Sequence, residues 1–446
     1  MIVSPLWRGK RFAVLGLARS GAATVRALVA SGADVTAWDS DIGKREALVD
    51  VVQQDSLELE GVALALADPE TIDLVGFDAL VVSPGVPLNR HPVAAKARAA
   101  DVPIIGDIEL FAQARAGLPP HKVVGITGTN GKSTTTALVH HILQTAGVPT
   151  LMGGNIGLPI LEQQPLAASG VYVLELSSYQ IDLTRNLDCD VAILLNITPD
   201  HLDRYDDGFG GYAASKARLF EMQSATHDAI ISIFDAPSAL IARGLSARGE
   251  HLHKIAPGVC MDQSRWPSLQ GPHNAQNALA AITACERLGI DNAAIDNAAI
   301  DKGLATFEGL PHRMQLVGTV NGVAYVDDSK ATNPESTAPA LAAFARVHWI
   351  LGGVAKSDNL DACAPHFGHV ARAYTIGEAG PRFAALLKDI MPVEECGTLN
   401  GAVARAAAIA QPGEVVLLSP ACASFDQFTD FEARGRAFRG LVGGLR

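Results

Sequence analysis

The sequence lacks the features that mark several large classes of protein. No run of Lys or Arg is longer than two residues, and the formal net charge is −12. Nucleic-acid backbones require a basic surface, so we expect no nucleic-acid partner. No apolar stretch approaches the ~20 residues of a membrane span, and glycines interrupt the apolar N-terminal stretch. We therefore expect no membrane span and no signal peptide.

Cysteine and charge are also scarce. The chain has six cysteines in 446 residues, none in a C-x-x-C pair, and 18% of its residues are charged against 48% hydrophobic. Scattered cysteines in a long chain indicate reduced thiols and a cytoplasmic protein. The length corresponds to roughly three packed domains. A small anionic substrate is compatible with the acidic balance, because a few local cations can bind it.

What the sequence does contain is an alternation of short β-branched runs with longer helical patterns, which predicts an α/β protein with parallel sheets. We expect strands at 11–17, 34–39, 78–87, 122–127, 171–176, 191–197, 227–234, 314–328, 347–353, 371–377 and 414–420. They group into three doubly wound units, in which ligands bind beyond the carboxyl ends of the strands. The duplicated unit in IDNAAIDNAAID (290–301) is too short for a solenoid and predicts a surface feature without function.

The most informative stretch is GITGTNGKSTTT (125–136), which departs from the usual G-x-x-x-x-G-K-[ST] phosphate loop because Ile126 occupies the position of its first glycine. A predicted strand precedes the stretch, and a predicted helix begins near Lys132. The helix start offers N–H donors and a positive dipole end to phosphate. Lys132 can reach the β- and γ-phosphates, and Ser133 or Thr134 can offer a hydroxyl to Mg²⁺. We therefore predict a triphosphate-binding loop.

Two further strand ends in the same unit carry potential metal ligands. Glu175 ends an apolar strand, where a carboxylate costs energy unless it is paired or bound to metal. His201 follows the next strand, in NITPDHLDRY. Lys216, in GYAASKARLF, has the pattern of an ordinary solvated helix lysine.

The first and third units also have polar loops at strand ends. LGLARSG (15–21), followed by Asp39, approximates a dinucleotide-binding fingerprint, with Ala18 in place of the middle glycine. It permits a nucleotide-type ligand, including a nucleotide sugar, and SPGVP (83–87) adds a second loop at that edge. In the third unit, DDSKATNPEST (327–337) and LLSPACASFDQF (417–428) suggest a site shared across a cleft.

Taken together, these motifs resemble the Mur ligases of peptidoglycan synthesis. The matching stretches follow in order over almost the whole chain: TGTNGKS (127–133), GGNIG (153–157), ELSSYQ (175–180), HLDRY (201–205), HNAQNALAA (273–281), GLPHR (309–313), DDSKATN (327–333) and LLSPACASFDQF (417–428). The last two are typical of the members that add D-glutamate to UDP-N-acetylmuramoyl-L-alanine.

The resemblance implies an ATP-dependent ligase that forms an amide bond through an acyl-phosphate intermediate, with Mg²⁺. It also implies three domains and a cytoplasmic monomer. The domains would be a Rossmann-like UDP-binding domain (1–106), a central P-loop ATPase-type parallel sheet (107–311) and a mobile Rossmann-like domain (312–446) that contacts D-glutamate and ATP.

The resemblance also assigns site residues. The catalytic set is Lys132, Glu175, His201, Lys216 and Arg313. The ATP contacts are Gly128, Thr129, Asn130, Gly131, Lys132, Ser133, Thr134, Asn274, Asn277, Arg313 and Asp328. The metal site uses Ser133, Thr134, Glu175, His201 and Lys216, the last as a carbamate that could bind a second Mg²⁺. The UDP-substrate contacts are Leu15, Asp39, Ser83, Pro84, Gly85, Asn155, Gln180 and His201. The D-glutamate contacts are Lys330, Thr332, Lys356, Ser424 and Phe431.

Three alternatives stay open. A ligase of the same fold could add another amino acid or be a folylpolyglutamate synthase, although KATNPES replaces the D-N-P-R-like motif of the diaminopimelate-adding members. A regulatory P-loop module would bind nucleotide without amino-acid-dependent phosphate release. An NAD-dependent oxidoreductase would explain LGLARSG but not Lys132 or the two later units.

Overall fold

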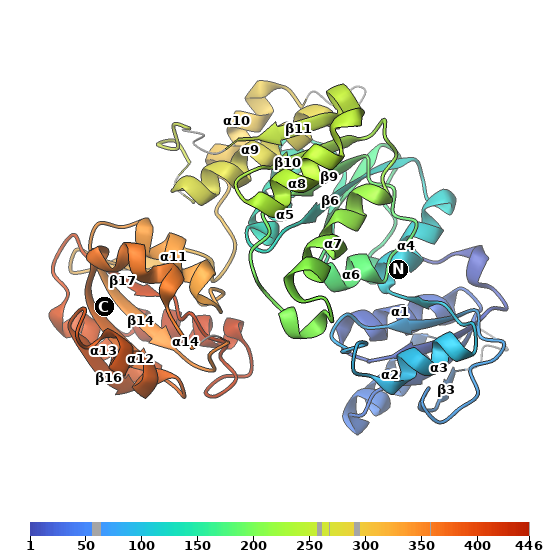
Figure 1. Cartoon of the computed structure of the whole chain (residues 1–446), viewed down its shortest axis with the longest axis horizontal. Coiled ribbons are helices and arrows are strands. Elements are labelled where there is room, and N and C mark those ends of the chain that lie inside the picture. Colours follow the sequence, from blue (N-terminus) through green and yellow to red (C-terminus); the bar gives the residue numbers. More distant parts are fainter. Residues whose placement is uncertain (56–63, 257–260, 267, 290–294, 357, 446) are drawn as a thin grey trace. The chain divides into compact units, whose positions relative to one another are not determined.

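The computed structural model describes residues 1–55, 64–256, 261–266, 268–289, 295–356 and 358–445. The chain forms two compact units (Figure 1). The first comprises Met1–Val259 and Gln276–Leu304, and the second comprises Cys260–Ala275 and Ala305–Arg446. Among the described residues, no helix combines the length and apolar character needed to cross a membrane.

The first unit opens with a five-stranded parallel sheet of order β3-β2-β1-β4-β5. Its strands are β1 (Arg11–Leu15), β2 (Asp34–Trp38), β3 (Leu64–Leu66), β4 (Ala79–Val82) and β5 (Ile104–Ile105). Its helices are α1 (Arg19–Ala30), α2 (Ile42–Asp55) and α3 (Pro92–Ala99). The strand order reverses between β1 and β4, which is where sheets of this type bind ligands. The loops after these two strands meet there, since the Ser83 hydroxyl donates to the Gly16 carbonyl at 2.7 Å.

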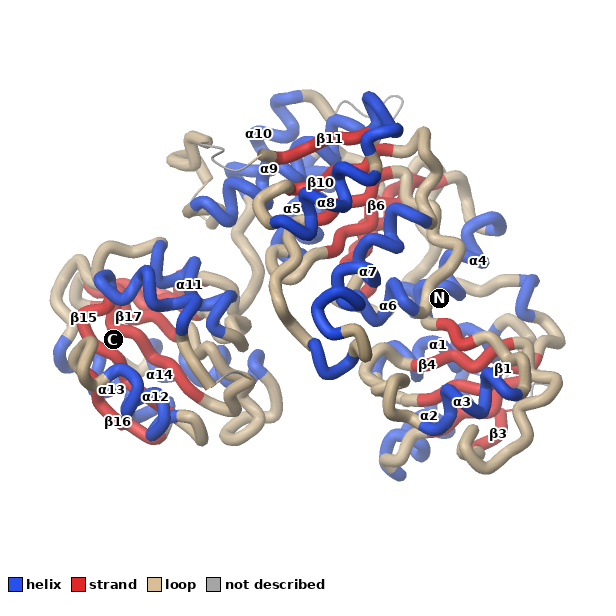
Figure 2. Tube along the Cα trace, viewed as in Figure 1, coloured by secondary structure: helices blue, strands red, loops and turns tan. Residues whose placement is uncertain are grey.

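The second sheet of this unit has six parallel strands in the order β11-β10-β9-β6-β8-β7. Figure 2 shows strands of this sheet in red, with β6, β10 and β11 labelled. Its strands are β6 (His121–Thr127), β7 (Thr150–Gly154), β8 (Gly170–Glu175), β9 (Val191–Leu194), β10 (Asp228–Ser232) and β11 (Leu252–Ile255). The helices are α4 (Asp107–Ala114), α5 (Lys132–Thr145), α6 (Ser178–Asp182), α7 (Gly208–Glu221), α8 (Ala236–Gly244), α9 (Pro272–Arg287) and α10 (Asn297–Thr306). One buried apolar cluster continues from Val25 and Leu28 on α1 to Tyr172 and Leu174 on β8, which joins the two sheets into one unit.

The second unit holds a six-stranded sheet of order β12-β13-β17-β14-β15-β16. Its strands are β12 (Gln315–Val320), β13 (Val323–Asp327), β14 (Val347–Gly352), β15 (Val370–Ile376), β16 (Val393–Gly397) and β17 (Val415–Leu418). The helices are α11 (Pro334–Ala342), α12 (Gly380–Leu387), α13 (Leu399–Ile409) and α14 (Phe431–Gly443). Trp349 and Leu417 pack with α11 and α12 on one face of the sheet, while Ile350 and Leu418 pack with α13 and α14 on the other. Both faces are therefore covered, as parallel sheets require.

The predicted α/β class with parallel sheets is confirmed, but the single strand expected over 314–328 is wrong. That stretch is the antiparallel hairpin β12–β13, which turns at Asn321 and Gly322. Both residues have positive φ, 51° and 78°, as tight two-residue hairpin turns demand. Of the duplicated stretch 290–301, residues 290–294 lie outside the described residues, and α10 begins at Asn297.

Candidate nucleotide and substrate site

The predicted phosphate loop lies between a buried strand and a helix, as expected. β6 ends at Thr127, and α5 begins at Lys132. Gly128 and Gly131 have φ of 150° and 86°, a region that glycine enters without strain. A Cβ on Gly131 would come 2.4 Å from the side-chain oxygen of Asn277, so glycine is also needed for packing.

The end of β9 holds this loop through Asn196, a residue that sequence reasoning missed. The Thr129 N–H donates to the Asn196 backbone carbonyl at 2.8 Å. The Asn130 N–H donates to Asn196 Oδ1 at 2.8 Å, and Asn196 Nδ2 returns a bond to the Asn130 carbonyl at 3.0 Å. The only sequence signal was an asparagine near the end of the apolar run VAILLNI (191–197).

These bonds to Asn196 determine which N–H groups of the loop can bind a phosphate. Those of Thr129 and Asn130 are engaged by Asn196. The first intrahelical bond of α5 runs from the Thr135 N–H to the Gly131 carbonyl at 3.0 Å. The donors that the helix start presents to an anion are therefore those of residues 131–134.

Two lysines meet at the Gly128 carbonyl. Lys132 Nζ donates to it at 2.9 Å and to the Thr129 carbonyl at 2.8 Å, while Lys216 Nζ donates to it at 2.9 Å. Lys216 is only 1% exposed and lies over the Tyr212 ring, with Nζ 4.5 Å from its centre. The solvated lysine read from the helix pattern alone is therefore wrong. Burial, and then the positive charge of Lys132, hold the pKa of Lys216 well below its ordinary value.

Among the residues that the structure describes, one carboxylate oxygen of Glu175 has no hydrogen-bond partner. Its Oε1 accepts a bond from Asn155 Nδ2 at 2.8 Å, whereas the buried Oε2 accepts none from the described residues. The whole residue is 2% exposed. A buried carboxylate oxygen in this state calls for a cation or a water molecule.

His201 follows β9 in an exposed turn, with a φ of 53°. Its ring centre is 5.4 Å from that of Tyr179, and its Nε2 is 3.5 Å from the Asp200 carboxylate. Within the described part of the chain, no three His, Cys, Asp or Glu side chains converge as a metal site. The predicted metal set therefore depends on hydroxyls and on modification of Lys216 as well as on Glu175 and His201.

Three neighbouring cavities share the loop after β4. One, of about 270 Å³, is lined by Lys132, Asn155, Tyr179, Asp200, His201, Tyr212, Lys216, Pro84 and Gly85, among others. A second, of about 360 Å³, includes Asp39, Ser83, Pro84, Gly85, Asn155 and Gln180. A third includes Leu15, Trp38, Asp39 and Gly85. Every residue predicted to contact the UDP substrate thus lines at least one of them.

Asp39 lines the second and third cavities and accepts a hydrogen bond from the loop after β1. Its Oδ2 accepts a bond from the Leu17 N–H at 2.7 Å, and Lys44 Nζ lies 3.5 Å away. Burial raises the pKa of Asp39, but bonds from the Asp41 and Leu17 N–H groups and the charge of Lys44 outweigh it and leave the pKa lowered. Asp39 is therefore a carboxylate that shapes the loop after β1.

In the second unit, the predicted D-glutamate residues follow three adjacent strands, β13, β17 and β14. Lys330 Nζ lies 4.1 Å from the centre of the Phe431 ring. Ser424 is buried, Thr332 is half-buried and Lys356 is exposed. Burial raises the pKa of Asp328 to about 7, against a bond from the Ser419 hydroxyl at 2.7 Å.

Sequence reasoning also missed Arg434, which joins two of these loops. Its guanidinium donates to the Ser329 carbonyl at 2.8 Å, to Ser329 Oγ at 2.9 Å and to the Cys422 carbonyl at 3.0 Å. Arg434 is 1% exposed. The burial of Arg434 and its bonds to these backbone carbonyls are visible only in the tertiary structure.

The predicted ATP residues fall in both units. Residues 128–134 and Asn277 belong to the first, whereas Asn274, Arg313 and Asp328 belong to the second. Asn274 and Asn277 lie on α9 and are both buried, and Arg313 is half-buried after the turn at Leu310.

Comparison with known proteins assigns the chain. Residues 10–106 match the Mur ligase MurD-like N-terminal domain, 126–255 the Mur ligase middle domain and 312–422 the Mur ligase glutamate ligase domain. The chain belongs to the Mur ligase family. It is accordingly a ligase, and the three matched segments correspond to the three sheets.

Within the Mur ligases, the chain has close relatives over its full length. It is 61% identical to the UDP-N-acetylmuramoylalanine–D-glutamate ligase of Novosphingobium aromaticivorans, covering 100% of this chain and 97% of that one. It is 56% identical to the ligase of the same name from Zymomonas mobilis, covering 100% of both. The MurF ligase of Thermotoga maritima, solved in complex with ADP, shares the fold, with a TM-score of 0.58, 16% identity and coverage of 83% of this chain and 90% of that one.

Proposed function

We propose that this Mur ligase uses ATP to join D-glutamate to UDP-N-acetylmuramoyl-L-alanine. The observation that carries the proposal is the continuity of the cavities in the first unit. The phosphate-loop lysine Lys132 and the nucleotide-side residue Asp39 line neighbouring cavities that share Pro84 and Gly85. A substrate with a nucleotide at one end and a carboxylate at the other fits such a row. The full-length relatives named for this reaction support the same substrates.

The chemistry follows from the low reactivity of a carboxylate as an acyl donor. The carboxylate oxygen of the L-alanyl end attacks the γ-phosphorus of ATP, and the bond to the β-phosphate oxygen breaks to give an acyl phosphate and ADP. The amine of D-glutamate then attacks the acyl carbon, inorganic phosphate leaves, and the amine loses a proton. Most of the first step's acceleration comes from positioning and charge neutralisation.

Lys132 and the start of α5 supply that neutralisation. The N–H groups of residues 131–134 bind phosphate oxygens, and Lys132 exchanges the Gly128 and Thr129 carbonyls for the γ-phosphate. Arg313 adds a second cation, and Asn274, Asn277 and Asp328 hold the nucleoside. Thr129 and Asn130 act by fixing the loop, because Asn196 engages their N–H groups.

The donor set fits Mg²⁺. The unpartnered Oε2 of Glu175 offers a hard anionic ligand, and Ser133, Thr134 and His201 offer neutral ones. A Lys216 carbamate would add two carboxylate-like oxygens, and the low pKa of the buried amine favours the neutral form that reacts with CO₂. Mg²⁺ at these residues would supply charge neutralisation of the phosphates.

The remaining predicted residues contact the two other substrates. Asp39, Ser83 and the loop after β4 hold the UDP end, while Asn155, Gln180 and His201 follow the muramoyl-alanine arm. Lys330 and Lys356 pair with the two carboxylates of D-glutamate, with Thr332 and Ser424 as hydroxyl donors and Phe431 supporting Lys330. We infer a cytoplasmic reaction, since its substrates are water-soluble metabolites. The expectation of a monomer rests on the resemblance to the Mur ligases alone.

Phosphate release tests the proposal. Purified protein with Mg-ATP and UDP-N-acetylmuramoyl-L-alanine should release phosphate when D-glutamate is added, but not with L-glutamate, L-alanine or meso-diaminopimelate. Release with one of those other amino acids would assign a different Mur-type activity. ATP binding without any amino-acid-dependent release would indicate a regulatory nucleotide-binding module.

A further inference from the structure

Arg204 has contacts that no step of the proposed reaction explains. It ends the short helical turn η4 (Leu202–Arg204), directly after His201. Its Nη2 donates to the carbonyls of Val86 at 2.7 Å and Pro84 at 3.2 Å, and its Nη1 donates to the carbonyl of Gly85 at 3.4 Å. The Arg204 side chain therefore donates hydrogen bonds to three successive carbonyls of the loop after β4.

This loop is the segment that the three cavities share. Gly85 lines all three, and Pro84 and Val86 line two each. Its backbone therefore forms part of the wall along the whole proposed path from the UDP end to the phosphate loop. Moving its three peptide groups would change every cavity at once.

The side chain of Arg204 is itself held in place. Its guanidinium carbon lies 4.2 Å from the centre of the Tyr179 ring, which lines the cavity beside Lys132. From the other side, Asn89 Nδ2 and Arg90 Nη2 donate to the Asp203 carbonyl at 3.0 and 3.1 Å. The turn that carries His201 and the loop that lines the UDP cavities are thus bonded to each other in both directions.

An arginine suits this task better than a lysine. Its planar fork offers several donors in fixed directions and stacks on an aromatic ring, whereas an ammonium group is a single point. The acceptors of these bonds are backbone carbonyl oxygens and not a carboxylate. The bonds therefore fix the backbone conformation of the loop.

We propose that Arg204 is a positioning residue that holds loop 84–86 in register with His201, so that UDP-substrate bound along this loop directs its carboxylate to the phosphate loop. The assignment of these cavities to the UDP-substrate rests on the proposed function. Arg204 contacts backbone and the Tyr179 ring, and it acts on the reaction through the loop.

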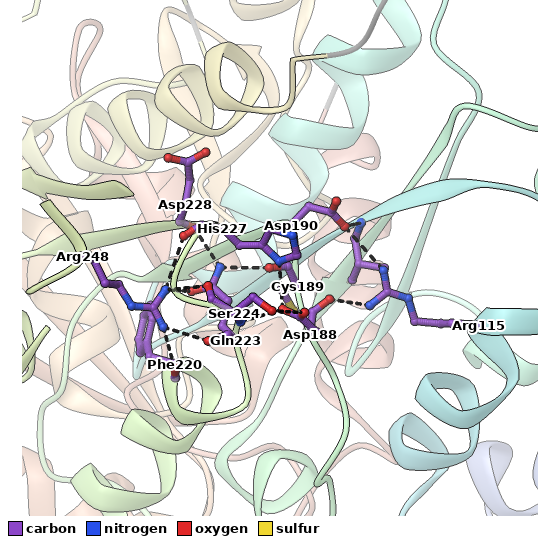
Figure 3. Close-up of polar contacts among 11 residues, drawn as sticks. Arg115, Asp188, Cys189, Asp190, Phe220, Gln223, Ser224, His227, Asp228 and Arg248 are labelled. Atoms are coloured by element: carbon purple, nitrogen blue, oxygen red, sulfur yellow. Dashed lines mark hydrogen bonds and ion pairs between the residues drawn. The ribbon is translucent and has the colours of Figure 1, made fainter. Parts of the chain in front are cut away.

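The test compares Arg204→Lys with Arg248→Lys. Arg248 also collects carbonyls, those of Phe220 at 2.7 Å and Gln223 at 3.1 Å among them (Figure 3). None of its partners lines the three cavities. Both variants keep the positive charge and lose a multidentate contact, but only one lies on the proposed substrate path.

For Arg204→Lys we expect KM for UDP-N-acetylmuramoyl-L-alanine, and its Kd measured by calorimetry without ATP, to rise about tenfold, the loss of roughly one strong charge-assisted bond. KM for ATP should stay within about twofold of wild type. Amide hydrogen exchange in residues 84–90 should accelerate. Arg248→Lys should lower Tm but leave both KM values and the exchange of residues 84–90 unchanged.

Two results would overturn the inference: unchanged exchange of residues 84–90 in Arg204→Lys, or equal changes in KM for all three substrates together with a Tm loss like that of Arg248→Lys. If the wild-type protein binds no UDP-N-acetylmuramoyl-L-alanine, the proposed function fails instead. The exchange measurement still decides whether Arg204 holds the loop, because it needs no ligand.

Discussion

Lys216 shows how burial changes the chemistry of a single residue. On α7 it shares the Gly128 carbonyl with Lys132, and its low pKa follows from burial and from that neighbouring charge. A lowered pKa means that the neutral amine persists to lower pH than in a solvated lysine. Only the neutral amine attacks CO₂, so a carbamate of Lys216 could form at lower pH than one of a solvated lysine, and its formation would decline as pH falls through the lowered pKa.

We therefore expect Lys216→Ala to lose activity by at least about a hundredfold, the range found when a charge-stabilising group is removed from an active site. Short carboxylic acids such as acetate should restore part of it by occupying the space of the carbamate. The exposed lysine Lys254 provides a matched control, since Lys254→Ala should retain full activity with or without acetate. Phosphate release against acetate concentration measures the effect, and absence of rescue would argue against a carbamate.

At the scale of elements, Asn196 links the segment after β9 to the phosphate loop, and its substitution tests that link. Asn196→Ala removes two hydrogen bonds to the Asn130 peptide. At about 1 kcal/mol for each net hydrogen bond, this loosens the loop enough to raise KM for ATP about tenfold or more. Steady-state kinetics with varied ATP provides the measurement.

Asn186→Ala provides the control for Asn196→Ala. The Asn186 side chain also makes a hydrogen bond, but to Glu109, away from the phosphate loop. It should change Tm without changing KM for ATP. An unchanged KM for ATP in Asn196→Ala would show that the loop keeps its shape without these bonds to the Asn196 side chain.

Most of the elements that the sequence predicted correctly have a local signal. The run KVVGIT followed by glycines and TTTALVHH specified strand, loop and helix, because each neighbour reinforces the next. The hairpin at Asn321 and Gly322 was missed although its turn signal is local, since the flanking runs were read as one strand. The edge strands β7 and β16 were missed because they carry short, partly polar runs whose pairing depends on partners distant in sequence.

At the scale of the whole molecule, the second unit has a series of polar contacts that runs from two buried side chains to an exposed arginine. The Tyr374 hydroxyl lies 2.9 Å from His348 Nδ1, and His348 Nε2 lies 2.8 Å from Glu414 Oε2. Arg346 Nε donates to Glu414 Oε1 at 2.5 Å. These contacts connect β14 and β15 with the residue that precedes β17, and so they contribute to the stability of the second unit.

The pKa of Glu414 predicts how that stability depends on pH. Burial raises its pKa, but bonds from the Gln411 N–H, His348 and Arg346 outweigh burial and lower it to about 2 from an ordinary value of 4.5. A lowered carboxyl pKa stabilises the folded state above pH ~4.5, and this contribution is lost as pH falls toward about 2. In Glu414→Gln we expect a lower Tm for the second unit at pH 6 and a smaller further loss between pH 5 and pH 3.

Scanning calorimetry of the full chain would measure the Tm of the second unit, because two units with separate cores can unfold in separate transitions. Glu395→Gln removes an exposed carboxylate from the same unit and should leave the transition near its wild-type position. If the Tm of Glu414→Gln depended on pH as that of the wild type does, Glu414 would not be the source of the pH dependence.

The sequence by itself determined the α/β class, the three sheets and the phosphate loop, because these depend on hydrophobic periodicity and on motifs whose residues are neighbours in the chain. It also placed most of the residues proposed to bind the substrates near strand ends, where parallel sheets bind ligands. Only the tertiary structure decided that Lys216 is buried, that Asn196 takes two N–H groups from the phosphate loop and that Arg204 holds the loop after β4. Burial and long-range hydrogen bonds arise from segments that lie tens to more than a hundred residues apart, so no local pattern encodes them.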